Sequence, residues 1–322
     1  MKRFKLIAAI LVAVLVCAGT WTSNNYLYKP TQGEYGTAGK VLFDTGLDRV
    51  DAKLGKSATV GDPNYLTFAA AVASLNISGT PTTLTVPNGT HTLTADLTSN
   101  SNITLRFDRG AVVSIPTGKT LTIAGSVEAS PHQIFSCAGT GKVSFTGSTL
   151  QVLPEWWGAV GNGTTNSTAA IQSAHDSLPA TRGGVISFST GVYLVTPGTI
   201  VISKPGIVLQ GRAAATDGAG VVAGTSFKAT ASGTGKMVAF QGAAAATPLD
   251  SCQINDISFN GNGETVQGFS LKWVSNFRLR NVWVIGCYDH GVYMEQVWDS
   301  TFYDLEVEAS GDLASSKAGL YI

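Results

Sequence analysis

The sequence predicts an all-β protein folded as a parallel β-helix, in which short strands wind into coils that stack along one axis. Three observations favour this solenoid. The composition suits strands and tight turns, a unit of 23 to 25 residues repeats near the C-terminal end, and two short helical stretches precede glycine turns as end caps would.

The composition excludes several classes of protein. Only 13% of the 322 residues are charged and 37 are glycine, whereas exposed helix faces usually carry many Glu and Lys residues. The 21 Lys and Arg residues balance the 21 Asp and Glu residues without a basic run, which argues against a nucleic-acid partner. With 44% hydrophobic residues, the chain is too apolar for disorder and can bury a large core.

The N-terminus predicts a secretory signal peptide over residues 1–18. Three basic residues precede an apolar run, residues 6–18, that is too short to span a bilayer. Small residues place the cleavage site after Ala18, so we expect secretion and no membrane association of the cleaved chain. Cys17 leaves a lipid-anchored lipoprotein open as one alternative, and an uncleaved membrane anchor is the other. Residues 19–59 are expected to form an irregular linker.

The remaining cysteines, Cys137, Cys252 and Cys287, are too few for a disulfide framework. Cys252 and Cys287 lie among apolar residues, so we expect both to be buried as small hydrophobic side chains. No Cys or His spacing resembles a zinc site, and no metal ligand is predicted.

Two similar segments predict the helical caps. Residues 60–93 and 160–195 each run from a glycine turn through an Ala-rich stretch to a second glycine turn between strands. Residues 68–75 and 168–174 should form the helices, and Asn166, Ser167 and Thr168 offer N-cap chemistry for the second. We expect each helix to cover the end of a β-coil, because an open strand edge invites aggregation.

The repeat itself alternates apolar and variable residues around one Asp or Asn. Its three copies are residues 252–259, 277–284 and 300–307. Equivalent inward residues should stack in two rows, which are Ile254, Leu279 and Phe302, and Ile257, Val282 and Leu305. Asp256, Asn281 and Asp304 should form bends, because Asp and Asn tolerate left-handed backbone. Stacking also explains the low charge, since rows of like charge would repel.

Residues 154–174, which begin Pro-Glu-Trp-Trp-Gly-Ala-Val-Gly-Asn-Gly, and residues 183–194 resemble the opening motif of the pectate-lyase superfamily. This superfamily of right-handed, single-stranded parallel β-helix proteins includes pectate lyases, rhamnogalacturonases, polygalacturonases and phage tailspikes. The chain departs from the motif at Asn162 and Asn166, where the family has Asp, and at Ser189, where it has Pro. The resemblance implies a pectin lyase-like solenoid with short capping helices, in a small section over residues 60–153 and a longer one over residues 154–322. Trp156 and Trp157 are expected to pack between the two sections.

The resemblance also implies a secreted enzyme, a glycoside hydrolase or a lyase, that acts on an acidic or complex polysaccharide such as pectin. A lyase of this kind would use calcium, whereas a hydrolase would need no cofactor. The alternative is a non-catalytic glycan-binding module of a surface protein or tailspike. A homotrimer is one expected assembly. Because the chain stops in the middle of a repeat, we expect it to be a fragment.

The candidate site residues come from outward positions of the repeated strands. Ser270, Tyr293 and Tyr321 should stack, with Lys272 and Glu295 two residues further on, and aromatic rings beside charged groups suit sugar binding. A second outward row contains Asn255, Arg280 and Tyr303. The candidate catalytic residues are Glu295, Glu306, Asp289 and His290, and the candidate substrate-binding residues are Tyr293, Tyr321, Lys272 and Arg280. The competing interpretation of Asp289 and His290 is a polar turn between two strands.

Overall fold

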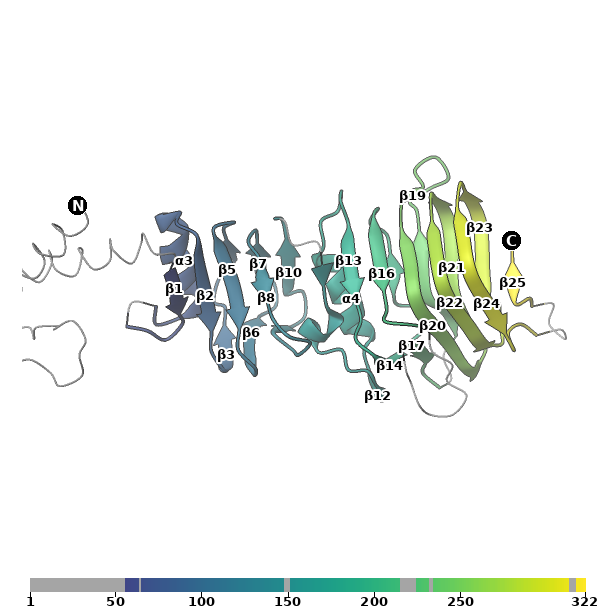
Figure 1. Ribbon diagram of the computed structural model, residues 1–322, viewed down its shortest axis with the longest axis horizontal. Helices are drawn as coiled ribbons and strands as arrows, with labels where there is room; N and C mark the ends of the chain where they lie inside the picture. Colours follow the sequence, from purple (N-terminus) through teal and green to yellow (C-terminus); the bar gives the residue numbers. More distant parts are fainter. Residues whose placement is uncertain (1–55, 64, 148–150, 215–223, 232–233, 313–316) are drawn as a thin grey trace, which may run out of the picture. The chain divides into compact units, whose positions relative to one another are not determined.

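The computed structural model describes residues 56–322 except 64, 148–150, 215–223, 232–233 and 313–316, and these residues form a parallel β-solenoid (Figure 1). The predicted parallel β-helix is therefore confirmed. The predicted signal peptide, Cys17 and all but the last four residues of the predicted linker lie outside the described residues. No helix in the described part of the chain is long and apolar enough to cross a membrane.

The first coils consist of short strands in three parallel sheets, ordered β1-β2-β5-β8, β3-β6-β9 and β10-β7-β4. From β2 to β10 the paired residues lie 21 to 24 positions apart, as Thr82 does from Ile103 and Leu97 from Leu121. The elements are β1 (Lys56–Thr59), α3 (Phe68–Ser78), β2 (Thr82–Val86), β3 (Gly89–Thr92), β4 (Leu97–Ser99), β5 (Ile103–Phe107), β6 (Ala111–Ile115), β7 (Thr120–Ile123), β8 (Val127–Glu128), β9 (Phe135–Cys137) and β10 (Lys142–Phe145).

The later coils form two larger parallel sheets. One contains β11, β13, β16, β20, β17, β14 and β12 and extends from β20 to β22 and β24, and the other is ordered β15-β18-β21-β23-β25, with β19 beside β21. The elements are β11 (Gln151–Val152), η1 (Pro154–Trp157), β12 (Asn162–Asn166), α4 (Thr168–Ser177), β13 (Gly184–Ser187), β14 (Gly191–Val195), β15 (Val201–Ile202), β16 (Ile207–Gln210), β17 (Thr225–Ala229), β18 (Gly235–Gln241), β19 (Leu249–Asp250), β20 (Gln253–Glu264), β21 (Val266–Ser275), β22 (Arg278–Cys287), β23 (Val292–Trp298), β24 (Thr301–Glu308) and β25 (Leu320–Tyr321).

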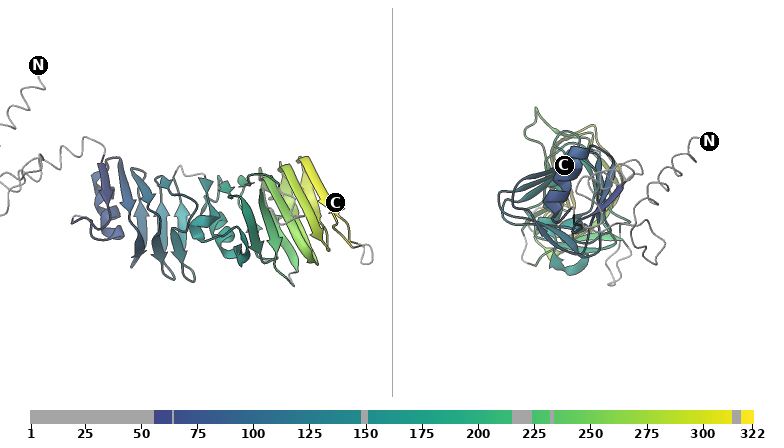
Figure 2. Two further views of the ribbon diagram at one scale, coloured as in Figure 1. Left: turned by 60° about the horizontal axis from the view of Figure 1, so that its bottom comes forward. Right: turned by 90° about the vertical axis from the view of Figure 1, so that its left-hand side faces the viewer.

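The predicted stacking registers are confirmed. The coils stack one beside the next (Figure 2). Both inward rows lie in register on β20, β22 and β24, and the buried side chains of the coils form one core. Cys252 and Cys287 are fully buried, as expected. The predicted bends are also present, because Asp256, Asn281 and Asp304 have φ angles of 59°, 51° and 52°. Asn281 Nδ2 donates to Asp256 Oδ1 over 2.8 Å, so the bends of neighbouring coils are joined laterally.

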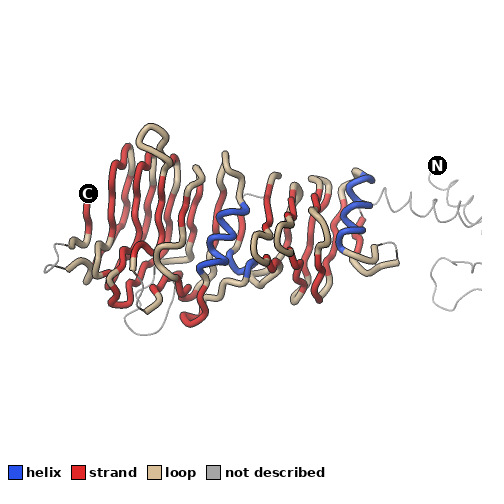
Figure 3. The backbone as a smooth tube through the Cα atoms, turned by 180° about the vertical axis from the view of Figure 1, so that it is seen from behind, coloured by secondary structure: helices blue, strands red, loops and turns tan. Residues whose placement is uncertain are grey.

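Both predicted helices form, and each lies against β-coils (Figure 3). Helix α3 begins after Thr67, whose Oγ1 accepts from Ala70 N over 3.1 Å. Helix α4 contacts β10, and the Gln172 side chain bonds both the N–H and the C=O of Val201 on β15. The N-cap chemistry of α4 comes from Asn166, whose Oδ1 accepts from Thr168 N, while the Ser167 side chain makes no cap bond. Thus α4 stands between the last strand of one sheet and the first strand of another.

The predicted packing role of the tryptophans is confirmed. Trp156 and Trp157 are 3% and 9% exposed and lie in η1. The ring of Trp157 lies 5.3 Å from that of Phe135, and the ring of Trp156 lies 6.5 Å from that of Phe145. This aromatic group closes the core between the short-stranded coils and the coils that follow.

Candidate functional site

The sheet β15-β18-β21-β23-β25 carries stacked aromatic rings near its last strand. Ser270, Tyr293 and Tyr321 lie in register on β21, β23 and β25, as the repeat predicted. The two tyrosine rings are parallel within 2° and 5.0 Å apart, and we call them the tyrosine ladder. Ser270 is only 2% exposed, so the exposed part of the row is the ladder itself, where Tyr321 is 45% exposed. Such a shelf presents aromatic surface to a ligand lying along the coils.

Charged groups border the ladder. Lys272 and Glu295 are in register on β21 and β23, and Lys272 Nζ lies 2.8 Å from Glu295 Oε1. Tyr293 Oη donates to the other carboxylate oxygen over 3.3 Å, and Lys272 Nζ also lies 4.7 Å from the ring centre of Trp273. The aromatic rings, the ammonium and the carboxylate thus share one surface.

The Glu295 carboxylate is held in its ionised form. The hydrogen bond from Lys272 lowers the pKa of Glu295, and the charge of Lys272 and the bond from Tyr293 act in the same direction. Desolvation, followed by the charge of Glu295, raises the pKa of Tyr293, so the phenol keeps its proton and donates. An ionised Glu295 can accept hydrogen bonds from hydroxyl groups or act as a base or nucleophile. It has no proton to give as a general acid at neutral pH.

Asp289 and His290 lie in the turn between β22 and β23 and hold the chain near β25. Asp289 forms an ion pair with Lys317 over 2.9 Å and accepts from Gln267 Nε2 over 3.1 Å. His290 is 6% exposed, and its Nδ1 accepts from Ala318 N over 3.1 Å. These contacts favour the polar-turn interpretation, although the predicted catalytic roles of both residues stay predictions.

Glu306 does not join this group. It lies on β24 beyond the bend at Asp304, in register with Trp283, in a different sheet from Glu295. Its side chain is exposed and has no hydrogen-bond or ion-pair partner among the residues that the structure describes. Glu295 and Glu306 thus lie in different sheets, and their pairing as the acid and base that flank one glycosidic bond stays a prediction.

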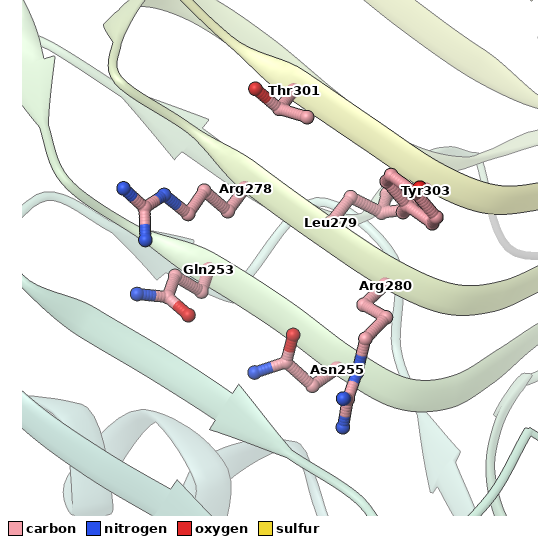
Figure 4. A pocket seen from close by; sticks show the side chains of 7 residues that line it. All are labelled: Gln253, Asn255, Arg278, Leu279, Arg280, Thr301 and Tyr303. Carbon is pink, nitrogen blue, oxygen red and sulfur yellow. The ribbon is translucent and has the colours of Figure 1, made fainter.

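The second outward row lines a separate hollow of about 580 Å³. Asn255, Arg280 and Tyr303 are in register, as predicted, and Arg280 and Tyr303 are both largely exposed. Side chains from three neighbouring strands, β20, β22 and β24, line the hollow (Figure 4). They are Gln253, Asn255, Arg278, Leu279, Arg280, Thr301 and Tyr303.

Arg278 was missed in the sequence, although its position carries a signal. It lies two residues before Arg280 in the same repeat, and period-two alternation places both side chains on one face of the strand. Only Asp256 forms an ion pair with Arg280 among the described residues, at a distance of 3.5 Å. The two guanidinium groups give this hollow a positive character suited to an acidic ligand.

The donor set for a metal is sparse in the described part of the chain. No group of three or more His, Cys, Asp and Glu side chains there could hold a metal ion. Any calcium needed for a lyase reaction would therefore need ligands from the substrate or from residues outside the described ones.

Comparisons with known proteins found similarity to two phage proteins. No family model matches the sequence. The chain is 30% identical over 178 residues to "Depolymerase 1, capsule KN3-specific" of Klebsiella phage KN3-1, covering 52% of this chain and 22% of that protein. Among solved structures, ORF18 of Geobacillus virus E2 has 31% sequence identity and a TM-score of 0.49, covering 54% of this chain and 33% of that chain. The chain thus spans about a fifth of the curated relative and a third of the solved one.

Proposed function

We propose that the chain, a pectate-lyase-like parallel β-helix with a phage relative, is part of a tailspike-type protein that binds and degrades a polysaccharide. The observation that carries this proposal is the tyrosine ladder bordered by Lys272 and Glu295. Sugar rings present C–H faces that pack on aromatic rings, while their hydroxyl groups need charged or polar partners. One surface offers both.

The phage relative supports the same proposal. Its name describes a depolymerase specific for a capsule, and it matches about half of this chain. The resemblance to the pectate-lyase superfamily implies either hydrolysis or elimination, and the products of the reaction distinguish the two. We propose Glu295 as the ionised group that acts on the bound glycan, as acceptor, base or nucleophile, because the Lys272 contact keeps it deprotonated.

The hollow with Arg278 and Arg280 supports a second, more specific proposal. Two exposed guanidinium groups beside Tyr303 would bind the carboxylates of an acidic polysaccharide through paired N–H donors. An acidic substrate, including pectin-like uronates, would then contact this face as well. A neutral capsule polysaccharide would leave this hollow unused.

The test uses the whole chain with polygalacturonate and a panel of acidic and neutral capsular polysaccharides. Release of reducing ends reports cleavage, and absorbance from unsaturated uronates separates elimination from hydrolysis. We expect Tyr321→Ala to weaken glycan binding about fivefold, as the loss of about 1 kcal/mol of ring packing implies. Tyr288→Ala is the matched control, because Tyr288 is 49% exposed but lies outside the ladder.

Three outcomes separate the candidate functions. Cleavage that is lost in Glu295→Gln, with binding retained, supports the degradative function. Binding without turnover of any glycan supports the non-catalytic module instead. If Tyr321→Ala and Tyr288→Ala bind equally well, the tyrosine ladder is not the binding surface.

We also propose an oligomeric state, a cellular compartment and a cofactor requirement for the protein. A homotrimer is expected from the resemblance to tailspikes, and light scattering of the purified full-length protein measures its mass. Secretion after cleavage at Ala18 is checked by N-terminal sequencing of the exported protein. Calcium dependence is expected only if the reaction is an elimination, and chelation during the activity assay tests it.

A further inference from the structure

A third outward row lies on the sheet of the tyrosine ladder, beyond the next bend of its strands. Asp250, Ser275 and Trp298 are in register on β19, β21 and β23, which are neighbours in Figure 1, and we call them the tryptophan row. The bends are Trp273 and Gln296, whose φ angles are 53° and 54°. They separate the row from the charged border of the ladder, so the row forms a surface of its own.

The side chains of the tryptophan row are open to solvent. Trp298 is 38% exposed, whereas the preceding residue, Val297, packs against the core. Asp250 and Ser275 are both partly exposed. Neighbouring strands lie about 4.8 Å apart, so the Cα atoms of Asp250 and Trp298, two strands apart, are separated by roughly 10 Å. A ligand packed on the exposed part of the Trp298 ring therefore lies beside the Ser275 hydroxyl and close to the Asp250 carboxylate.

Hydrogen bonds hold the Asp250 carboxylate in place and ionised. Its Oδ1 accepts from Ser275 Oγ over 2.8 Å and from Asn276 Nδ2 over 2.7 Å, and its Oδ2 accepts from Ser251 Oγ over 2.7 Å. The bonds from Asn276, Ser251 and Ser275 lower the pKa of Asp250. Among the described side chains only Ser251 donates to Oδ2, so this oxygen can accept a further hydrogen bond from a ligand.

The backbone of Trp298 is fixed as well. Its carbonyl oxygen accepts from Asn276 N over 3.1 Å and from Ser300 Oγ over 2.8 Å. Asn276 therefore bonds both to Asp250 and to the strand that carries the ring. The carboxylate and the aromatic ring are positioned before a ligand binds, which lowers the entropic cost of binding.

We propose that the tryptophan row binds a neutral sugar residue, which packs on Trp298 and donates a hydroxyl group to Asp250. This inference rests on the proposed function and adds a subsite for the glycan. An aromatic ring offers apolar surface to the C–H face of a sugar, and an ionised carboxylate accepts from its hydroxyl groups.

The surroundings of Asp250 disfavour charged ligands. No Lys, Arg or His in the described part of the chain forms an ion pair with this carboxylate. An acidic sugar would bring a second carboxylate next to it without a neutralising cation. A cationic ligand is less suited than a hydroxyl group, because three donors already occupy most of the acceptor positions of Asp250.

The experiment titrates the full chain with methyl glucoside and methyl galactoside, followed by saturation-transfer NMR and by tryptophan fluorescence. We expect saturable binding that changes the tryptophan emission. Trp298→Ala should weaken this binding about fivefold, which is the effect of losing one aromatic contact. Asp250→Asn should weaken it as well, because an amide nitrogen cannot accept a hydrogen bond. Trp298→Phe should retain binding by NMR and lose the emission change, which assigns the signal to this ring.

Tyr288→Ala is the matched control, because Tyr288 is 49% exposed and lies outside the row. The proposal is overturned if neither glycoside binds, or if Trp298→Ala binds the glycosides as well as Tyr288→Ala does. Binding of glucuronate or methylammonium as tight as that of methyl glucoside would also overturn it, since the row would then not select a neutral sugar.

Tyr321→Ala separates this proposal from the proposed function, because it should leave methyl-glycoside binding unchanged while it weakens binding of the polysaccharide. A polysaccharide that binds through the ladder, with no dependence on Trp298, overturns the proposal for the tryptophan row alone. Glycoside binding that depends on Trp298, without binding or cleavage of any polysaccharide, supports the row as a sugar site and overturns the proposed function.

Discussion

The short-stranded coils and the coils from β20 onwards differ in the length of their strands and in the residues that form their corners. The strands β1–β10 are two to five residues long, whereas β20–β24 are seven to twelve. Several corners of the first coils are glycines with positive φ, such as Gly89 and Gly118. The later strands bend at Asp and Asn residues that adopt left-handed backbone, such as Asp256 and Asn281. An Asn corner can bond to the coil beside it through its side chain, as Asn281 does, whereas Gly89 and Gly118 bond to the next coil only through backbone groups such as their N–H.

The outward rows of the two regions differ in the same sense. Thr98, Thr122 and Ser144 stack in the first coils and present only hydroxyl groups. The later coils stack aromatic and charged side chains, as in the tyrosine ladder and in the row that contains Arg280. The first region also has one charged row, in which Thr85, Arg106 and Glu128 are in register and Arg106 pairs with Glu128 over 2.8 Å, but its described ring contacts include no stacked outward rings like the tyrosine ladder. This difference locates the candidate substrate-binding chemistry in the later coils.

The largest expected effect comes from the core of the later coils. Phe259→Ala should destabilise the protein by about 3–5 kcal/mol, because this fully buried ring packs on Phe227 and Phe269. Solenoid coils contact mainly their neighbours, so hydrogen exchange should increase most in β17, β20 and β21. Mass spectrometry of the exchanged peptides measures this.

Leu105→Ala is the matched change in the first coils. Leu105 is fully buried on β5, and its loss should increase exchange in β2, β5 and β8 instead. Equal loss of protection throughout the described coils in both variants would show that the two regions unfold as one unit. The comparison between them would then describe their surfaces and not their stability.

A smaller effect is expected at the bend formed by Asn281. Asn281→Ala places an alanine at φ 51° and removes the 2.8 Å bond to Asp256, which together should cost about 2–3 kcal/mol. Asn281→Gly loses the bond but relieves the backbone, so it should cost about 1 kcal/mol. Urea denaturation measures both. Equal destabilisation by Ala and Gly would mean that the lateral bond, and not the backbone conformation, makes this residue matter.

The sequence predicted those features that follow from repetition. Spacing and alternation were sufficient to place Leu279 inside the core, Asn281 at a bend and Tyr293 in register with Tyr321, because each depends on one strand and its copy. A hollow of about 480 Å³ lined by Glu155, Ser189 and Tyr193 could not be predicted, because it lies where one sheet ends at β9 and another begins at β12. The burial of Ser270 could not be predicted either. Alternation predicts which face of the strand a side chain lies on, but not how far the neighbouring side chains cover it.

The smallest effect on stability is expected at Glu295, where titration is the informative measurement. Lys272 lowers the pKa of Glu295, so their contact stabilises the fold above the ordinary pKa of a glutamate and is lost as the pH falls through the lowered value. Lys272→Met should raise the pKa of Glu295 toward its ordinary value with little change in unfolding, because both side chains are partly exposed. Carboxyl NMR of the labelled protein reports the midpoint. Lys142→Met, an exposed lysine of the first coils, should leave that midpoint unchanged. An ordinary pKa in the unmodified protein would mean that Glu295 is not held ionised by Lys272, and the charged border of the tyrosine ladder would then be no more organised than the surface of the first coils.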